Sequence, residues 1–326
     1  MSAMLMFVLL LVLAAEFVNG WTDAPNAIAT VVSTKVMKPR TAVMMAVVFN
    51  ILGALSGTAV AITIGKGIVD PAIINYKTIA ASMIAIVSWS TIAYRWGIPT
   101  SESHELVASL MGAGLATAGP KVLLWSGWEK IFLGLFFATV LGFFGGYFVS
   151  KIVYYTSRYR NVRKMRKLYG RLQILSSGLM AFSHGSNDGQ KFIGVFALCL
   201  MMSTGSGVFS VPLWVIFVCA IVMGIGTMTG GWKIIRTMGM RLVQLKTHQG
   251  FSAETGASAV ILAASYFGIP LSTTHAINTS IMGVGAADNK RAVDWRVAGE
   301  IAKVWILTFP VCAIIGYCVA LFINLF

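Results

Sequence analysis

The sequence predicts an all-α polytopic membrane protein. We expect two inverted repeats of about five membrane segments each, with broken helices and Ser/Thr hairpins at the midplane. Three observations predict this fold: 57% of the 326 residues are hydrophobic and only 11% are charged, the apolar runs are long and continuous, and two pairs of polar motifs recur along the chain. In a soluble domain of this length, roughly a quarter of all residues are charged, so most of the surface of this protein must face lipid.

The recurring motifs indicate a duplicated unit. One pair places Gly three residues before Asp, at Gly20 and Asp23 and again at Gly185 and Asp188. The other pair begins with Gly-Ile-Pro and ends with His, at 97–104 and 268–275. We therefore divide the chain into a first repeat (1–155), a basic connector (156–171) and a second repeat (172–326). Polar, Gly/Pro-broken sequence at membrane depth in both copies is typical of a transporter whose site lies between the repeats.

The membrane segments follow one order in each repeat: a broken first segment, two full helices, a segment broken around Ser101 or Ser272, and a long fifth helix. A helix needs about 20 apolar residues to cross a bilayer. The apolar stretch 4–18 has no basic residues before it, contains Glu16 and is followed directly by Asn19. We therefore expect half of a broken helix and not a signal peptide. The long apolar runs are 41–64, 78–94, 131–150, 211–231 and 297–324.

Charge placement predicts the orientation in the cell membrane. Eight of the 25 Lys and Arg residues lie between Lys151 and Arg171, and basic loops favour the cytoplasm. With the connector 156–171 cytoplasmic, both termini lie outside, and equivalent loops of the repeats carry opposite charge bias, as inverted topology requires. The expected partner of this surface is the lipid bilayer and not nucleic acid.

Asp23 and Asp188 are the most costly residues in these segments. A carboxylate at membrane depth needs a cation, a proton or a partner. We expect the neighbouring Gly, Asn and Pro residues to break the helix and free carbonyl oxygens, which with Thr22, Asn26 and Asn187 form an oxygen cage for a small cation. Helix capping is the alternative role for these residues.

The two Gly-Ile-Pro hairpins favour an anion instead. Their hydroxyl groups stand at the start of an apolar helical run, where the helix N-terminus carries about half a positive charge and binds phosphate or sulfate. Ordinary N-capping is again the alternative. The hydroxyl residues are Ser101, Ser103, Ser272, Thr273 and Thr274.

Further polar residues support these sites. Lys191 either contacts the anion or pairs with Asp23 or Asp188, and Gln190 stands beside it. His184 lies four residues before Asp188, on the same helical face. The remaining supporting residues are Glu254, His104 and His275. We expect Glu254 to pair with connector charge, and the two histidines either to serve the anion or a coupling proton, or to bond a carbonyl and hold the turn.

Together these motifs resemble the PiT family of inorganic phosphate transporters, of the bacterial and archaeal permease type, over essentially the whole chain. The resemblance implies symport of phosphate with Na⁺ or H⁺. It implies cation ligation, including Na⁺ at Asp23 and Asp188, by Asp23, Asn26, Asn187 and Asp188, and phosphate binding by the five hydroxyl residues of the hairpins. The motifs are 19–27, 183–188, 230–233, 249–251 and 270–275. Glu102 and Glu105, in the first hairpin, and Asn50 depart from the family's usual residues.

Alternative functions follow from the same residues. The fold could move sulfate or a metal–phosphate complex, or act as a passive anion channel. An intramembrane hydrolase would need a nucleophile, but no Gly-x-Ser-x-Gly elbow occurs, so we expect no enzyme and no cofactor beyond the coupling ion. Close-packing Gly142, Gly145 and Gly146 favour a homodimer.

Overall fold

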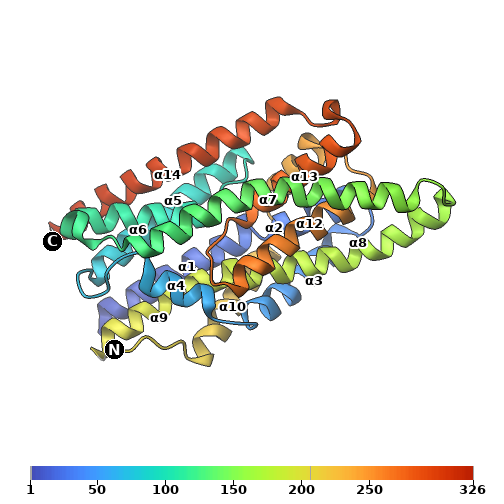
Figure 1. Cartoon of the computed structure of the whole chain (residues 1–326). Helices are drawn as coiled ribbons and strands as arrows, with labels where there is room; N and C mark the ends of the chain where they lie inside the picture. The colour runs from blue at the N-terminus through green and yellow to red at the C-terminus, as the bar shows by residue number, and fades with distance from the viewer. Residues whose placement is uncertain (1, 206, 326) are drawn as a thin grey trace.

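The apolar runs fold into long helices that pack side by side as an elongated bundle (Figure 1). The computed structural model describes residues 2–205 and 207–325. Within these ranges all named elements are helical and no β-strand occurs, apart from two isolated bridges, Val69 with Leu123 and Val243 with Val293. The prediction of an all-α protein is thus confirmed.

The helices of the two halves follow the same order. The first half comprises α1 (Ala3–Thr22), α2 (Pro25–Ser33), α3 (Pro39–Ala54), α4 (Ala59–Gly67), α5 (Tyr76–Trp96), α6 (Glu102–Ala118) and α7 (Trp125–Ser157). The second comprises α8 (Val162–His184), α9 (Gln190–Thr204), α10 (Leu213–Met228), α11 (Trp232–Arg236), α12 (Thr247–Tyr266), α13 (Thr273–Asp288) and α14 (Trp295–Asn324).

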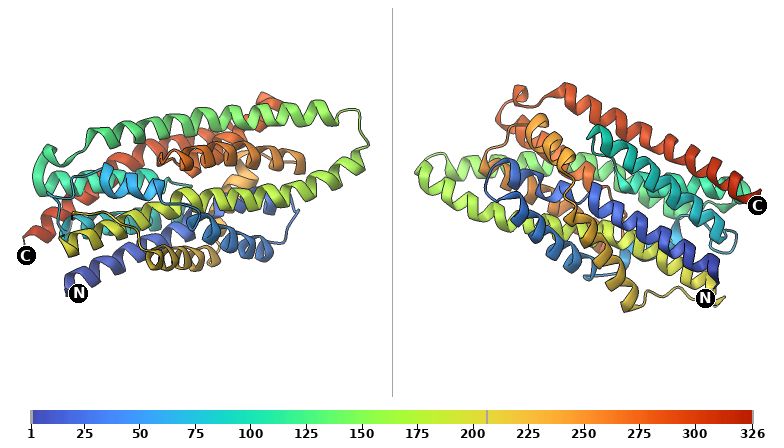
Figure 2. Two further views of the ribbon diagram at one scale, coloured as in Figure 1. Left: turned by 60° about the horizontal axis from the view of Figure 1, so that its bottom comes forward. Right: turned by 180° about the vertical axis from the view of Figure 1, so that it is seen from behind.

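The two halves interlock through equivalent contacts. Helix α7 packs on α12 and α13, and α14 packs on α5 and α6. Likewise α1 packs on α10, and α3 packs on α8. Both termini lie at one end of the bundle and the α7–α8 turn lies at the other (Figures 1 and 2). Most of the predicted connector 156–171 is helical, because α7 runs to Ser157 and α8 begins at Val162.

Three helical stretches are long and apolar enough to cross a membrane: Ala3–Ser33, Trp125–Ser157 and Trp295–Asn324. The run 41–64, which we expected to be one full helix, is instead a bent pair, α3 and α4. The run 211–231 holds the single helix α10, and the chain bends at the end of this run, before the segment Trp232–Leu242. The angle is 67° between α3 and α4, and 62° between α10 and the helical segment Trp232–Leu242. The first bend is stabilised by Gln190, whose Oε1 accepts from Val60 N at 3.0 Å at the start of α4. Large apolar side chains such as Phe136 and Ile306 are exposed on the outside, as a lipid-facing surface requires.

The third and fourth segments of each half form one antiparallel hairpin. Thr78 on α5 bonds Thr117 on α6 at 2.8 Å, and Ser82 bonds Ser109 at 2.7 Å. Gly97 makes the reversal possible because its φ of 67° lies in the left-handed region, which glycine adopts at little cost. Its counterpart Gly268, between α12 and α13, has φ 64°. The hairpins enter from opposite ends and meet tip to tip.

Close helix contacts bring the polar motifs to the centre. An added Cβ on Gly185 would lie 2.1 Å from the carbonyl oxygen of Asn50 on α3, and one on Gly20 would lie 2.1 Å from that of Met223 on α10. Such separations exclude any side chain, so these two glycines let α8 and α1 press against their partners. Gly142, Gly145 and Gly146 pack in the same way against α12 and α13 of this chain. They are therefore not free to join a second copy, and the homodimer stays a prediction without that support.

Candidate functional site

The hairpin tips contact each other at the centre of the molecule. Ser101 Oγ donates to Ser272 Oγ at 2.8 Å. Each serine is also the N-cap of its helix, accepting from His104 N at 3.3 Å and from His275 N at 3.2 Å. The positive ends of α6 and α13 therefore meet at one place, where an anion is favoured.

Asp188 lies in a π-helical turn, Gly185–Gly189, between α8 and α9. The sequence led us to expect a broken helix here, but the chain stays helical from Val162 to Thr204. A π-turn inserts one extra residue into the helix, and such turns are frequent at functional sites. It directs the Asp188 carboxylate toward the hairpin tips, where Thr273 Oγ1 donates to it at 2.6 Å. His184 Nε2 lies 3.5 Å from the same carboxylate.

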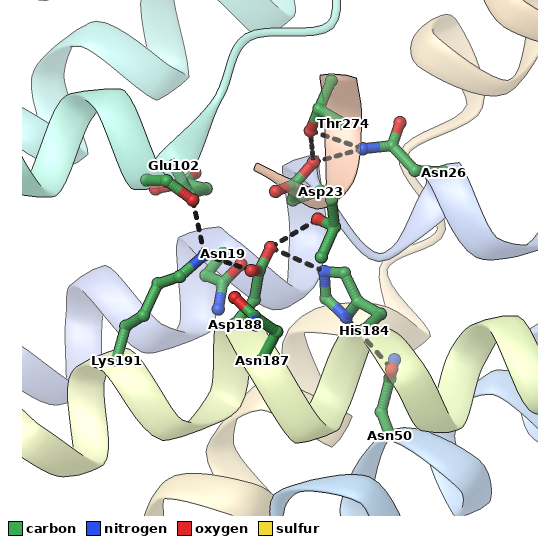
Figure 3. Close-up of polar contacts among 12 residues, drawn as sticks. Asn19, Asp23, Asn26, Asn50, Glu102, His184, Asn187, Asp188, Lys191 and Thr274 are labelled. Carbon is green, nitrogen blue, oxygen red and sulfur yellow. Dashed lines mark hydrogen bonds and ion pairs between the residues drawn. The ribbon is translucent and has the colours of Figure 1, made fainter. Parts of the chain in front are cut away.

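Lys191 is buried with no exposed surface and forms an ion pair with Asp188. It also donates to Ser103 Oγ on α6 and, at 2.9 Å, to the carbonyl oxygen of Leu271 in the second hairpin. One ammonium group thus joins α9 to both hairpins, and Figure 3 shows Lys191 beside Asp188. A buried charge is tolerated only when it is paired and hydrogen-bonded, and Lys191 meets both conditions.

Asp23 holds the equivalent position at the end of α1. Asn19 O accepts from Asp23 N at 2.9 Å and from Ala24 N at 3.4 Å, and the chain turns here before α2 begins at Pro25. Thr274 Oγ1 donates to the Asp23 carboxylate, and Asn26 contacts both, with its Nδ2 2.8 Å from Thr274 Oγ1. Asn26 Oδ1 has no hydrogen-bond partner in the part of the chain that the structure describes.

Three groups together could hold a metal ion. One carboxylate oxygen each of Asp23 and Asp188 and a ring nitrogen of His184 lie within 4.8 Å of one another, all buried (Figure 3). Two oxygens with nearby hydroxyls suit Na⁺ and other hard cations, while the imidazole adds a ligand that divalent transition metals accept. His184 is oriented by Asn50, whose Oδ1 lies 3.0 Å from His184 Nδ1.

Two of the predicted ligands are already hydrogen-bonded within the protein. Asn187 Oδ1 accepts from Leu271 N at 3.1 Å, and its Nδ2 donates to Ser265 Oγ at 3.0 Å, so this amide holds the second hairpin. Gln190 caps α4 as described above and donates to Ser186 O at 2.7 Å. Their roles as cation and phosphate ligands remain predictions.

The first hairpin adds an acidic cluster. Glu102 Oε1 accepts from Thr22 Oγ1 at 2.9 Å and from Ser90 Oγ at 3.0 Å, and Ser90 also contacts Glu105. Thr22 therefore faces this cluster. Ser90 was not predicted, because it lies in an apolar run of α5. A signal that could have found it is a hydroxyl in the helix that pairs, across the hairpin, with the helix that carries Glu102 and Glu105.

Of the other supporting residues, the two hairpin histidines lie at the centre and Glu254 lies away from it. The His104 and His275 rings meet edge to face with centroids 4.6 Å apart, and His275 stacks on Trp305 at 3.7 Å. Glu254 is buried elsewhere, between Thr30 and Ser176, which both donate to it.

A polytopic helical protein with re-entrant hairpin tips, a buried Lys–Asp pair and further acids at its centre is a membrane transporter by class. The sequence comparisons give the family. A model of the phosphate transporter family matches residues 19–169 and again 155–316, and the chain belongs to that family. Its transporters are not enzymes, so the expectation of no enzymatic activity is confirmed and the hydrolase alternative is dropped.

Individual relatives cover the whole chain. A probable low-affinity inorganic phosphate transporter of Bacillus subtilis (strain 168) is 37% identical and covers 100% of this chain and 99% of its own length. One of Rhizobium meliloti (strain 1021) is 39% identical, with 97% of each chain covered. A solved structure titled "The sodium-dependent phosphate transporter" matches with a TM-score of 0.89 at 24% identity, covering 99% of this chain and 100% of its own, which shows the same fold.

Proposed function

We propose that this protein transports inorganic phosphate across the cell membrane in symport with a cation, Na⁺ or H⁺. The observation that carries the proposal is that each buried carboxylate bonds a hydroxyl of the second hairpin: Asp188 with Thr273, and Asp23 with Thr274. Family membership and the names of the relatives support phosphate as the substrate.

These contacts supply a coupling mechanism. A hydroxyl has one proton to donate, so Thr273 and Thr274 cannot bond their carboxylates and a phosphate oxygen at once. A cation or proton that neutralises the carboxylates frees both hydroxyls. They then join Ser101 and Ser272 at the two helix N-termini, and phosphate binds most tightly when the cation is already present. The doubly loaded site carries less net charge and crosses the low-dielectric barrier more readily than a half-loaded one.

The proposed orientation follows the charge pattern. The α7–α8 turn carries Arg158 and Arg160, and it lies opposite the two termini (Figure 1). Under the positive-inside rule this turn is cytoplasmic and both termini are outside.

The test is labelled phosphate uptake into proteoliposomes, with the sodium gradient and the pH gradient imposed separately. Uptake driven by one gradient names the coupling ion, and uptake that needs neither would contradict symport and favour a passive channel. The variant Asp188→Asn should reach the membrane folded yet lose coupled uptake. The matched control Asp70→Asn, in the loop before α5, should keep it. Full uptake by Asp188→Asn would contradict the mechanism.

A second candidate substrate is a metal–phosphate complex, which the Asp23, His184 and Asp188 group favours. In that case phosphate uptake would require a divalent cation such as Mg²⁺ or Ca²⁺ and stop with a chelator, and labelled metal would enter with phosphate. Sulfate as substrate would appear as competition that is independent of pH, because sulfate stays fully ionised near neutrality.

A further inference from the structure

We propose that the connector end of the protein carries a second anion site, separate from the hairpin tips, which binds a phosphoryl-bearing polyanion. The ligand is a soluble diphosphate or the headgroup of a phosphorylated lipid. The site is a cavity of about 580 Å³ between the α7–α8 turn, the end of α2 and the start of α12. Small-molecule pockets measure about 300–1,000 Å³, so the cavity can hold more than one phosphoryl group.

The charge of this cavity is of one sign. Arg158, Arg160, Arg166 and Lys246 line it, and no acid is among the described residues that do so. Asp288 approaches Lys246 at 3.9 Å, but the two side chains are 68% and 53% exposed, so this pair is weak. A concave wall of like charges focuses the field and draws in ligands of opposite charge. Guanidinium groups also match pairs of phosphate oxygens in geometry.

The inner wall of the cavity is already ordered. Tyr169 is only 7% exposed, and its hydroxyl bonds Ser157 Oγ at 2.7 Å. The His248 ring lies 6.2 Å from that of Tyr169, measured between centroids. Hydroxyl and imidazole groups thus line the inner wall of the cavity, and the exposed basic side chains surround its opening. A bound anion would meet hydrogen-bond donors of the inner wall that are already in position. Its binding would then mainly order the arginine side chains.

The cavity touches the two elements that support the central site. Thr34 lines it and directly follows α2, which carries Asn26. Thr247 and His248 line it at the start of α12, which carries Ser265, the partner of Asn187. A ligand that bridges the ends of α2 and α12 fixes their separation, and it can bias transport only as far as that separation differs between transport states.

The simpler explanation is that these basic residues only satisfy the positive-inside rule. In that case any basic residue at this end of the bundle would attract anions equally. Lys38 and Arg40 allow the comparison, because they lie at the start of α3, at the same end, and do not line the cavity.

The experiment uses the full chain, purified in neutral detergent without added lipid. Pyrophosphate is titrated by calorimetry against the wild type, the double variant Arg158→Gln/Arg166→Gln, and the control Lys38→Gln/Arg40→Gln. Native mass spectrometry with added phosphatidic acid forms the lipid arm. Thermal unfolding checks that each variant is folded, and the single variant Lys246→Gln replaces the double variant if that one is not.

We expect Arg158→Gln/Arg166→Gln to bind at least one probe about tenfold more weakly, which equals about 1.4 kcal/mol. The control Lys38→Gln/Arg40→Gln should bind both probes nearly as the wild type does. Loss of pyrophosphate binding assigns a soluble diphosphate, and loss of phosphatidic acid alone assigns a lipid headgroup. Equal weakening in both pairs would show diffuse surface attraction and overturn the proposal. Failure of the wild type to bind either probe would overturn it as well.

Discussion

The central site consists of two half-sites, the first around Asp23 and the second around Asp188. They are built alike but charged differently. Asn26 and Lys191 each stand three residues after their aspartate, and Ser103 and Thr274 hold equivalent places in the two hairpins. The cross-contacts match too, because Asn26 donates to Thr274 as Lys191 donates to Ser103. The second half-site, however, holds its own ammonium group, while the first has only a neutral amide.

The hairpins extend this difference. Glu102 in the first hairpin stands where the second has Thr273. Thr273 donates to Asp188, whereas Glu102 accepts from Thr22 and Ser90. The first half-site is therefore rich in acids and has no resident cation among the residues that touch Asp23 in the described structure. We therefore expect the external cation to bind closer to Asp23, which has no ammonium partner of its own. It still reaches Asp188, because one oxygen of each carboxylate lies within 4.8 Å of the other.

The largest effect should come from making the second half-site like the first, with Lys191→Asn. Removing one partner of a buried ion pair costs about 3–5 kcal/mol, so we expect uptake to fall about 100-fold or more. Initial uptake rates in proteoliposomes check this. The control Lys303→Asn, on the exposed face of α14, should be near wild type. If Lys191→Asn kept its uptake, Asp188 would not depend on the ammonium group.

The converse change, Asn26→Lys, makes the first half-site like the second. An ammonium group beside Asp23 would occupy the place of the external cation, so uptake should lose its dependence on the cation gradient and fall by about tenfold, the effect of about 1.4 kcal/mol. Uptake measured with and without the gradient is the readout, and Asn26→Gln, which keeps the amide, should retain the dependence. A gradient dependence unchanged in Asn26→Lys would mean that the coupling ion acts elsewhere.

The sequence predicted the composition of these half-sites better than their shape. Repetition of motifs was enough to select Asp23, Asp188 and the hairpin hydroxyls. The π-turn at Asp188 could not be foreseen, because Gly and Asn suit a broken helix and a widened one equally well, and contact with α3 decides between them. The partner of Lys191 was left open between Asp23 and Asp188. The pair with Asp188 follows i,i+3 spacing in one helix, but the contacts of Lys191 with Ser103 and Leu271 in the two hairpins depend on tertiary packing.

A smaller effect should follow from Thr273→Val, which keeps the shape and removes the donor to Asp188. A hydrogen bond to a charged group contributes about 1.5–3 kcal/mol, so the cooperativity between cation and phosphate should fall about tenfold or more. The measurement is the apparent phosphate affinity at low and at saturating cation. Thr273→Ser should restore the coupling, because it restores the hydroxyl. A loss of affinity that is equal at all cation concentrations would point to simple loss of a phosphate ligand.

The smallest effect concerns the hairpin caps, where the two halves are most alike. Ser101→Ala and Ser272→Ala each remove an N-cap, which costs about 1 kcal/mol, together with their shared hydrogen bond. Thermal unfolding in detergent should show a similar small loss of stability for both, while Ser203→Ala, on an exposed serine after α9's apolar run, should show none. Because the two serines share one bond, the double variant should lose less than the sum of the single losses. Strict additivity would mean that the hairpin tips do not stabilise each other, and the half-sites would then be independent in stability as well as different in charge.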